Sequence, residues 1–312
     1  MAPDVHASLA AEAPAALAPA AALRSFTAKV LERAGVPPAQ AASSAEALLY
    51  ASERGVDTHG VRNLKRYYVD GIVRGEITPA ADFTVEHRTP LSMRVDGDNG
   101  LGMAACAWGM ERALEMARES GVGLVAINNS NHFGAAGAYT HLAVEAGFIG
   151  ISMTGSMFAT GRHRAVVPSD GTLQLFGTNP LSFGFPGAEE PPFLLDMATS
   201  VVPQNRVEML ASEGLSEIPA GWAIRSDGSA ATDPEAFDAL LPVGGREKST
   251  GGHKGTALAA LVEAMTAVLS GAWRLHEVAD IMEDDPCAPP PPLAGRLPSL
   301  YELLSFTLKP DP

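Results

Sequence analysis

Cysteine and basic residues are both scarce in this chain of 312 residues. Its two cysteines, Cys106 and Cys287, rule out a disulfide framework. Cys106 falls on the apolar face of an expected helix, where a buried filler is more common than a nucleophile. With 22 Lys and Arg against 36 Asp and Glu, the formal net charge is -14. This balance argues against nucleic acid and anionic membrane surfaces as partners.

The chain also lacks a long uninterrupted apolar run. Its most apolar stretch, residues 256–272, contains Glu263 and is too short to span a bilayer. Residues 1–22 are rich in Ala and Pro without a cationic start and an apolar run behind it. We therefore expect a disordered extension there and not a signal peptide. Together these absences predict a cytoplasmic protein with no membrane partner.

Three common kinds of site are missing as well. The eight histidines are scattered, none at the i, i+4 spacing of a helix-based zinc site, so we expect no metal. No GxSxG motif is present to hold a serine nucleophile. Neither the GxxxxGK[ST] phosphate loop nor the GxGxxG dinucleotide motif occurs at the Gly-rich turns.

What is present begins with an N-terminal helical region, which we place at residues 23–85. Apolar spacing predicts one helix from Leu23, a break at Pro37 and Pro38, and a second helix over 39–54. A third helix is expected after Asp57 and Thr58. One of these two residues would be its N-cap, which would place His59 in the first turn.

Residues 86–272 predict an α/β core, and residues 273–312 an atypical Pro-rich tail with a short apolar run over 300–306. A helix between two apolar segments predicts a βαβ unit with parallel strands. The expected elements of the core are a turn at 95–100, a helix over 103–119 ended by Gly121, a strand over 122–127, a helix over 138–146, strands over 148–154, 181–185 and 193–196, and a helix that follows Gly255 and ends at Gly271.

The Gly-rich turn over 129–137 is the most informative stretch, because it joins an expected strand to an expected helix. Such a turn presents backbone N–H groups at the positive end of a helix, which suits a phosphate or carboxylate. His132 and Phe133 stand beside those amides. A redox-cofactor site is the sharper interpretation, and a tight connection without a ligand is the alternative.

A second group combines Thr58 and His59 with Arg62 and Arg66. An imidazole at a helix start is held neutral by the dipole and can exchange a proton near pH 7. Either arginine can clamp a carboxylate with two hydrogen bonds. The alternative is a capped surface helix with ordinary charges.

Two further features carry similar pairs of interpretations. Asp196 ends an apolar strand, where it would orient His59, meet a cofactor hydroxyl or simply cap the next segment. Lys254 follows two glycines at a helix start, where it would bind an anion or lie solvated beside a glycine hinge. Proton-transfer residues, an anion clamp and phosphate-binding turns without a nucleophile favour hydride transfer.

Seven segments, in this order, resemble the malate/L-lactate/ureidoglycolate dehydrogenase family, which also holds sulfolactate dehydrogenase, diketogulonate reductase and the piperideine- and pyrroline-carboxylate reductases. The resemblance covers about residues 22–272. The matching segments are Thr58–Val61, Ser130–Gly134, Phe176–Phe183, Leu195–Ser200, Ile218–Ala223, Thr232–Pro234 and Gly252–Gly255.

The resemblance implies a sulfolactate-dehydrogenase-like α/β fold, a mixed sheet flanked by helices that binds NAD(P)H without a Rossmann domain. It implies a homodimer acting on a small carboxylate substrate. His59 would exchange the proton, supported by Thr58 and Asp196, and His132 would be either a base or a cofactor contact. The remaining implied cofactor contacts are Phe133, Gly134, Ser156, Asp196, Met197, Ala198, His253 and Lys254.

Three departures from the family pattern stand out. The family's substrate-carboxylate arginine is replaced by Asn63, with Arg62 and Arg66 nearby. An Ala-Arg-Gly-Lys-like segment is replaced by Pro203–Arg206. After Gly271 the family continues through strands and helices, whereas here we expect a short tail without that pattern.

Two functions follow from these patterns. The first is an NAD(P)H-dependent oxidoreductase acting on a 2-oxo acid, its 2-hydroxy partner or a cyclic imino acid. The second is a catalytically impaired relative that binds a ligand or a partner. The intact His59, His132, Asp196 and Lys254 favour the enzyme, and the unusual tail favours the second function.

Overall fold

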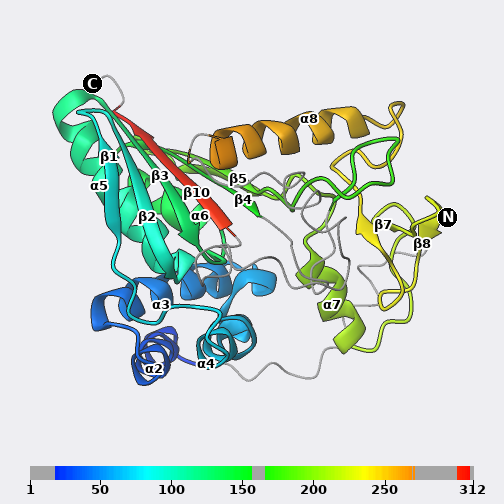
Figure 1. The fold of residues 1–312 in the computed structure, drawn as a ribbon, viewed down its shortest axis with the longest axis horizontal. Helices are drawn as coiled ribbons and strands as arrows, with labels where there is room; N and C mark the ends of the chain where they lie inside the picture. Colours follow the sequence, from blue (N-terminus) through cyan, green and yellow to red (C-terminus); the bar gives the residue numbers. More distant parts are fainter. Residues whose placement is uncertain (1–17, 157–165, 269, 271–300, 310–312) are drawn as a thin grey trace.

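Figure 1 shows the computed structural model, which describes residues 18–156, 166–268, 270 and 301–309. Within this part of the chain, a mixed seven-stranded sheet is packed between helices, and a smaller lobe holds a three-stranded sheet. Among the helices described, none combines the length and the hydropathy needed to cross a membrane.

The two N-terminal helices are close to expectation. Helix α2 spans Ala20–Arg33 and α3 spans Pro38–Glu53, where a proline at the first helical position forfeits no hydrogen bond. Helix α2 starts at Ala20, so residues 20–22 are helical and not part of a disordered extension. Residues 1–17 lie outside the described residues.

The prediction of a regular third helix is wrong. The chain forms two 3₁₀ turns, η1 (Asp57–His59) and η2 (Val61–Asn63), then a π-helix, η3 (Leu64–Val69), and one turn of α-helix, α4 (Asp70–Val73). Gly60 is extended, with ψ of -164°, and the next N–H bonds to the Ser52 hydroxyl at 3.0 Å. This anchor on α3 interrupts the helix, so His59 does not lie on a helix start.

The main sheet combines strands from distant parts of the chain. In spatial order it contains β1 (Thr84–Arg88), β2 (Ser92–Gly100), β3 (Val122–Ser130), β10 (Tyr301–Leu308), β4 (Ile149–Ser156), β5 (Leu181–Phe185) and β6 (Phe193–Met197). Strand β10, drawn in red in Figure 1, crosses the middle of the sheet.

Strands β3 and β4 are parallel, as expected, but they are not neighbours. Strand β10 lies between them and pairs antiparallel with both, Phe306 with Leu124 on one side and Ile151 on the other. A segment that the sequence assigned to the tail therefore provides an inner strand. Residues 271–300, including the expected stop at Gly271, lie outside the described residues.

The expected turn over 95–100 is instead the end of β2. The strand continues to Gly100 by means of an irregularity in which Asp98 and Asn99 adopt φ of 50° and 54°. The Asp96 carboxylate accepts a hydrogen bond from the Asp98 N–H at 2.7 Å, which stabilises this local bend. Turn-forming residues here bend a strand without ending it.

Helices cover both faces of the sheet. Helix α5 (Gly102–Ser120), which ends at the left-handed Gly121 as expected, and α6 (Gly137–Glu145) pack on the face that carries Val125 and Ile127. Helix α8 (Gly252–Glu263), continued by the π-helix η4 (Ala264–Val268), packs on the face of Ala126 and Met153. Burial of both faces explains the nearly continuous apolar runs of these strands.

The smaller lobe has its own core. It contains α7 (Gln204–Ser212) and the short strands β7 (Ala223–Ile224), β8 (Ala230–Ala231) and β9 (Ala239–Leu240). Val207 and Leu210 of α7 pack with Ile218 and Phe237 in a separate hydrophobic cluster. Strands this short gave no alternating pattern that would predict them.

The first residue of α5 allows a test of the packing. A Cβ on Gly102 would lie 1.8 Å from the Asn131 carbonyl oxygen, whereas a Cβ on Gly221 meets nothing within 4 Å. We expect Gly102→Ala to lower the free energy of unfolding by about 3 kcal/mol, because backbone must move. Urea unfolding measures it, with Gly221→Ala as the control. Equal stability of the two variants would contradict this packing.

Candidate active site

Several strands deliver their last residues to one edge of the sheet. Strand β2 is parallel to β3, β3 is parallel to β4 through β10, and β4 is parallel to β6 through β5. Their carboxyl ends therefore share an edge, the usual position of ligand sites in α/β proteins. The chain leaves β3 there towards His132, while Ser156 ends β4 and Met197 ends β6.

His59 is held by a hydroxyl and not by a carboxylate. The Thr58 Oγ1 lies 2.9 Å from the His59 Nδ1, within hydrogen-bond distance. A hydroxyl can either donate or accept, so this contact suits both neutral tautomers of the ring. Burial lowers the pKa of His59 to about 4, so the ring is neutral near pH 7. Desolvation, and not the helix dipole that we expected from the sequence, therefore keeps the His59 ring neutral.

His132 has a defined tautomer. Its Nδ1 lies 3.3 Å from the Gly134 N–H, which can only donate, and 2.7 Å from the Tyr68 hydroxyl. Nδ1 must therefore carry a lone pair, and the neutral ring carries its proton on Nε2. Tyr68 is fully buried, which keeps its hydroxyl in place.

The two imidazoles lie close together. The His59 and His132 rings stack with centroids 5.6 Å apart and an interplanar angle of 18°. The Tyr67 ring is also nearly parallel to His132, at 5.7 Å. Both histidines remain partly exposed, so a substrate can reach them. The structure thus brings together His59 and His132, which are 73 residues apart in the chain.

Asp196 serves a different neighbour from the one expected. Its Oδ2 accepts a hydrogen bond at 2.8 Å from the N–H of Gly137, the first residue of α6. Desolvation raises the pKa of Asp196, and this hydrogen bond opposes the rise. Among the described residues, no hydrogen bond joins Asp196 to His59. A Cβ on Gly137 would lie 2.8 Å from that Oδ2 and 2.7 Å from the Tyr50 hydroxyl, so a larger residue would displace these two side chains.

The two expected substrate arginines differ in their surroundings. Arg66 forms an ion pair at 2.6 Å with Glu208 of α7. Arg62 is exposed, and the described part of the chain contains no hydrogen bond or ion pair to its side chain. Asn63 is buried and its Nδ2 donates to the Thr58 carbonyl at 2.8 Å. Position 63 therefore supports the turn that carries His59.

Sequence reasoning missed Tyr67, Tyr68 and Asn205. Asn205 of α7 donates from Nδ2 to the Thr58 carbonyl at 2.8 Å and accepts from the Tyr67 hydroxyl at 2.5 Å. Burial raises the pKa of Tyr67 to about 12, so this hydroxyl keeps its proton to donate. The only sequence signal was that Asn205 lies in a segment departing from the family pattern.

The expected cofactor contacts are spread over several elements. Phe133 is buried in the main core against Tyr139, with ring centroids 5.3 Å apart, and its carbonyl accepts a hydrogen bond from the Tyr139 hydroxyl. Ala198 directly follows β6, next to the shared edge. His253 and Lys254 are exposed on the first turn of α8, and among the described residues no hydrogen bond ties them to the histidine pair.

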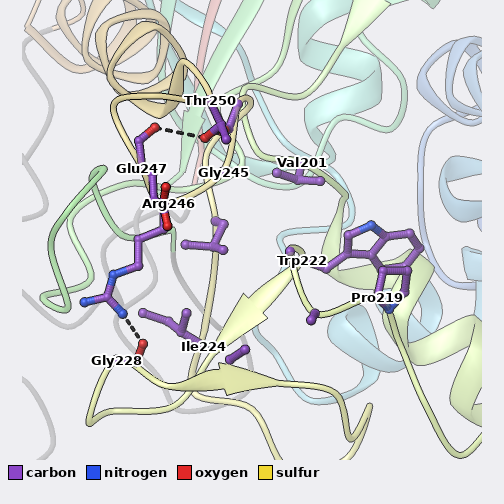
Figure 2. A pocket seen from close by; sticks show the side chains of 14 residues that line it. Val201, Pro219, Trp222, Ile224, Gly228, Gly245, Arg246, Glu247 and Thr250 are labelled. Carbon is purple, nitrogen blue, oxygen red and sulfur yellow. Dashed lines mark hydrogen bonds between the residues drawn. The ribbon is translucent and has the colours of Figure 1, made fainter. Parts of the chain in front are cut away.

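A pocket of about 620 Å³ opens beside the loop that leads into α8. Figure 2 shows Arg246 reaching the Gly228 carbonyl and Thr250 bonded to Glu247, while Trp222 and Pro219 form the other side. None of the expected site residues lines this pocket. In the described part of the chain, no group of His, Cys, Asp or Glu side chains is placed to hold a metal ion.

Comparison with known proteins decides the family. The model of the malate/L-lactate dehydrogenase family matches residues 18–296. The chain belongs to this family. A malate dehydrogenase of Pyrococcus abyssi is 42% identical over 258 residues, which cover 81% of this chain and 69% of the relative. An NAD(+) ureidoglycolate dehydrogenase of Escherichia coli K12 is 35% identical over 252 residues, 81% of this chain and 68% of the relative.

Solved structures of this dehydrogenase family share the fold. A Δ1-piperideine-2-carboxylate reductase from Pseudomonas syringae superposes with a TM-score of 0.78 at 30% identity, over 94% of this chain and 82% of that one. The expected family and fold class are confirmed. This dehydrogenase and reductase family consists of oxidoreductases, and its members use a nicotinamide cofactor in general.

The lowered pKa of His59 can be tested directly. Its folded value of about 4 is below the unfolded value of 6.5, so the unfolded chain binds the proton first as the pH falls. The free energy of unfolding therefore has its full value above pH 6.5. It falls by about 3 kcal/mol in total as the pH is lowered towards 4. A histidine NMR titration, assigned with His59→Gln, measures the midpoint. A midpoint near 6.5 would refute the burial.

Proposed function

We propose that this protein transfers a hydride between NAD(P)H and a small 2-oxo acid, its 2-hydroxy partner or a cyclic imino acid. The observation that carries the proposal is the stacked pair of His59 and His132, each with a hydroxyl on Nδ1, beside the edge where parallel strands end. Such a pair supplies proton transfer and a hydrogen bond without a nucleophile.

The residues at this edge fit a nicotinamide dinucleotide. The carboxyl ends of β4 and β6 carry Ser156, Met197 and Ala198, and the carboxylate of Asp196 lies next to the start of α6. Gly134 provides backbone close to His59, since a Cβ there would lie 3.9 Å from the His59 carbonyl oxygen. His253 and Lys254 would hold phosphate at the start of α8. When bound, the cofactor supplies or accepts the hydride.

His59 exchanges the proton with the reacting oxygen or nitrogen of the substrate. As a neutral ring it accepts the hydroxyl proton of a 2-hydroxy acid on Nε2, while Nδ1–H donates to Thr58 Oγ1. In reduction the same step runs in reverse: the ring that is protonated on both nitrogens gives its Nε2 proton to the substrate and returns to the neutral form, while Nδ1–H still donates to Thr58 Oγ1. The Thr58 hydroxyl therefore supports both directions of the reaction.

His132 acts as a hydrogen-bond donor rather than a base. Gly134 and Tyr68 both occupy its Nδ1, which places the proton on Nε2. An Nε2–H group directed at a substrate carbonyl oxygen stabilises the negative charge that develops there during reduction. The sequence left open a base or a cofactor contact for His132; this geometry does not favour the base, and the cofactor contact stays a prediction.

The alternative of an impaired ligand-binding relative has no support in the comparisons. A homodimer and a cytoplasmic location stay predictions. The relatives are named for malate, ureidoglycolate and piperideine-2-carboxylate, which fits the proposed class of small carboxylate substrates.

Replacing the proton-transfer group tests the mechanism. We expect His59→Ala to lower kcat by on the order of 10²–10⁴-fold, because a positioned general acid or base contributes about that much. Binding of NADH or NADPH, followed by nucleotide fluorescence, should persist in the variant. The assay is nucleotide oxidation against a panel of 2-oxo acids and cyclic imines. Near-normal kcat in the variant would refute the role of His59.

The arginines test how the substrate carboxylate is bound. Because Arg66 is engaged by Glu208 and Asn63 points inward, we expect Arg62 to make the contact. Arg62→Ala should lower kcat/KM by roughly 10–150-fold, the cost of about 1.5–3 kcal/mol for a charged hydrogen bond. Arg66→Ala should have a smaller effect.

The move of the carboxylate-binding arginine from position 63 to position 62 should alter substrate preference. We expect bulkier or cyclic substrates to be used better than malate- and lactate-type acids, because Arg62 approaches from a different side than residue 63 would. Efficient turnover of pyruvate or oxaloacetate that survives removal of both arginines would overturn this assignment.

A further inference from the structure

The turn that carries His59 has little backbone support of its own. Its 3₁₀ segment η1 has three residues, and Gly60 behind it is extended. Within the turn, the His59 N–H bonds to the Val56 carbonyl at 3.0 Å and the Gly60 N–H to the Asp57 carbonyl at 3.3 Å. Short 3₁₀ turns have poor hydrogen-bond geometry. The orientation of His59 therefore depends on contacts from outside the turn.

Those contacts converge on the carbonyl group that precedes His59. The Thr58 oxygen accepts one hydrogen bond from Asn63 Nδ2 and another from Asn205 Nδ2, each at 2.8 Å. Two amide donors use both lone pairs of this oxygen. The Thr58–His59 peptide plane is fixed in this way by two side chains, one from the next turn and one from α7 of the smaller lobe.

The oxygen of the Asn205 amide bonds to Tyr67, which is a neighbour of the second histidine. The Asn205 Oδ1 accepts from the Tyr67 hydroxyl at 2.5 Å, and the Tyr67 ring lies nearly parallel to His132 at 5.7 Å. The side chain of Asn205 therefore connects the backbone beside His59 with an aromatic neighbour of His132. Asn63 and Asn205 both stand at positions where this chain departs from the family pattern, so the two departures meet at one oxygen atom.

We propose that Asn205 is a positioning residue that holds the His59 turn and the Tyr67 ring in register, so that the smaller lobe sets the spacing of the two imidazoles. This inference rests on the proposed function for its effect on catalysis. Misplacement of a reacting group by about 1 Å lowers the rate on the order of 10²-fold. We therefore expect loss of the Asn205 contacts to lower kcat by a comparable factor.

The decisive variant is Asn205→Leu, which keeps a similar volume and removes both hydrogen bonds without adding charge. We expect kcat to fall by about 10–100-fold while KM for the cofactor changes by less than about threefold. Tyr67→Phe removes the bond to Oδ1 and keeps the ring and both bonds to the Thr58 carbonyl, so its loss should be smaller. Ser212→Ala, on the exposed end of the same helix, is the control and should behave as wild type.

A second readout does not require turnover. A turn released by Asn205→Leu carries His59 towards water, so its pKa should rise from about 4 towards 6.5 in a histidine NMR titration. If the wild type turns over no substrate of the panel, the proposed function fails, and this titration still decides the inference. Unchanged kcat and an unchanged titration midpoint in folded Asn205→Leu would overturn it. Should that variant not fold, an unchanged midpoint in folded Asn205→Ala, which also removes the Nδ2 donor to the Thr58 carbonyl, would do the same.

Discussion

The candidate site depends on a backbone contact between the start of α5 and the loop after β3. Gly102 lies against the Asn131 carbonyl so closely that any side chain would displace it. The Asn131 side chain in turn donates to the carbonyls of Asn99 and Gly100 at 2.8 and 3.1 Å, at the left-handed bend of β2. The next residue in the loop is His132. Its position is therefore set by strand and helix ends and not by a flexible connection.

Much of the fold could be predicted because most elements have simple periodic patterns. Helix α5, its stop at Gly121 and strands β5 and β6 follow the expected ranges closely. The prediction of a regular third helix was wrong because the local sequence after Thr58 does not reveal that the Ser52 hydroxyl accepts a hydrogen bond from the Val61 N–H. Strand β10 was not predicted because its eight residues follow a Pro-rich stretch. They pair with strands over 140 residues away, and the local sequence does not identify these partners.

Most residues of the candidate site could be predicted from the sequence, but the contacts between them could not. Thr58, His59 and His132 were singled out from motifs, and the structure joins them through hydroxyl contacts and ring stacking. Asp196 was expected beside His59 but bonds to Gly137, since which strand end meets which helix start is a property of the sheet order. Tyr68 and Asn205 were missed because a buried hydroxyl and an amide on another lobe give no local signal. Both histidines are consequently paired with neutral groups, which makes desolvation the main electrostatic influence on His59.

The place of β10 in the sheet has a consequence for how the molecule is made. Until residues 301–308 leave the ribosome, β3 and β4 each present an open inner edge, and the nascent chain cannot join its two half-sheets. The β1–β2–β3 and β4–β5–β6 halves must wait for a closure that spans more than 140 residues, which is entropically slow. Unpaired inner edges invite pairing with other chains during that interval. Synthesis of this protein thus passes through an aggregation-sensitive stage that ends only when β10 is made and pairs with β3 and β4.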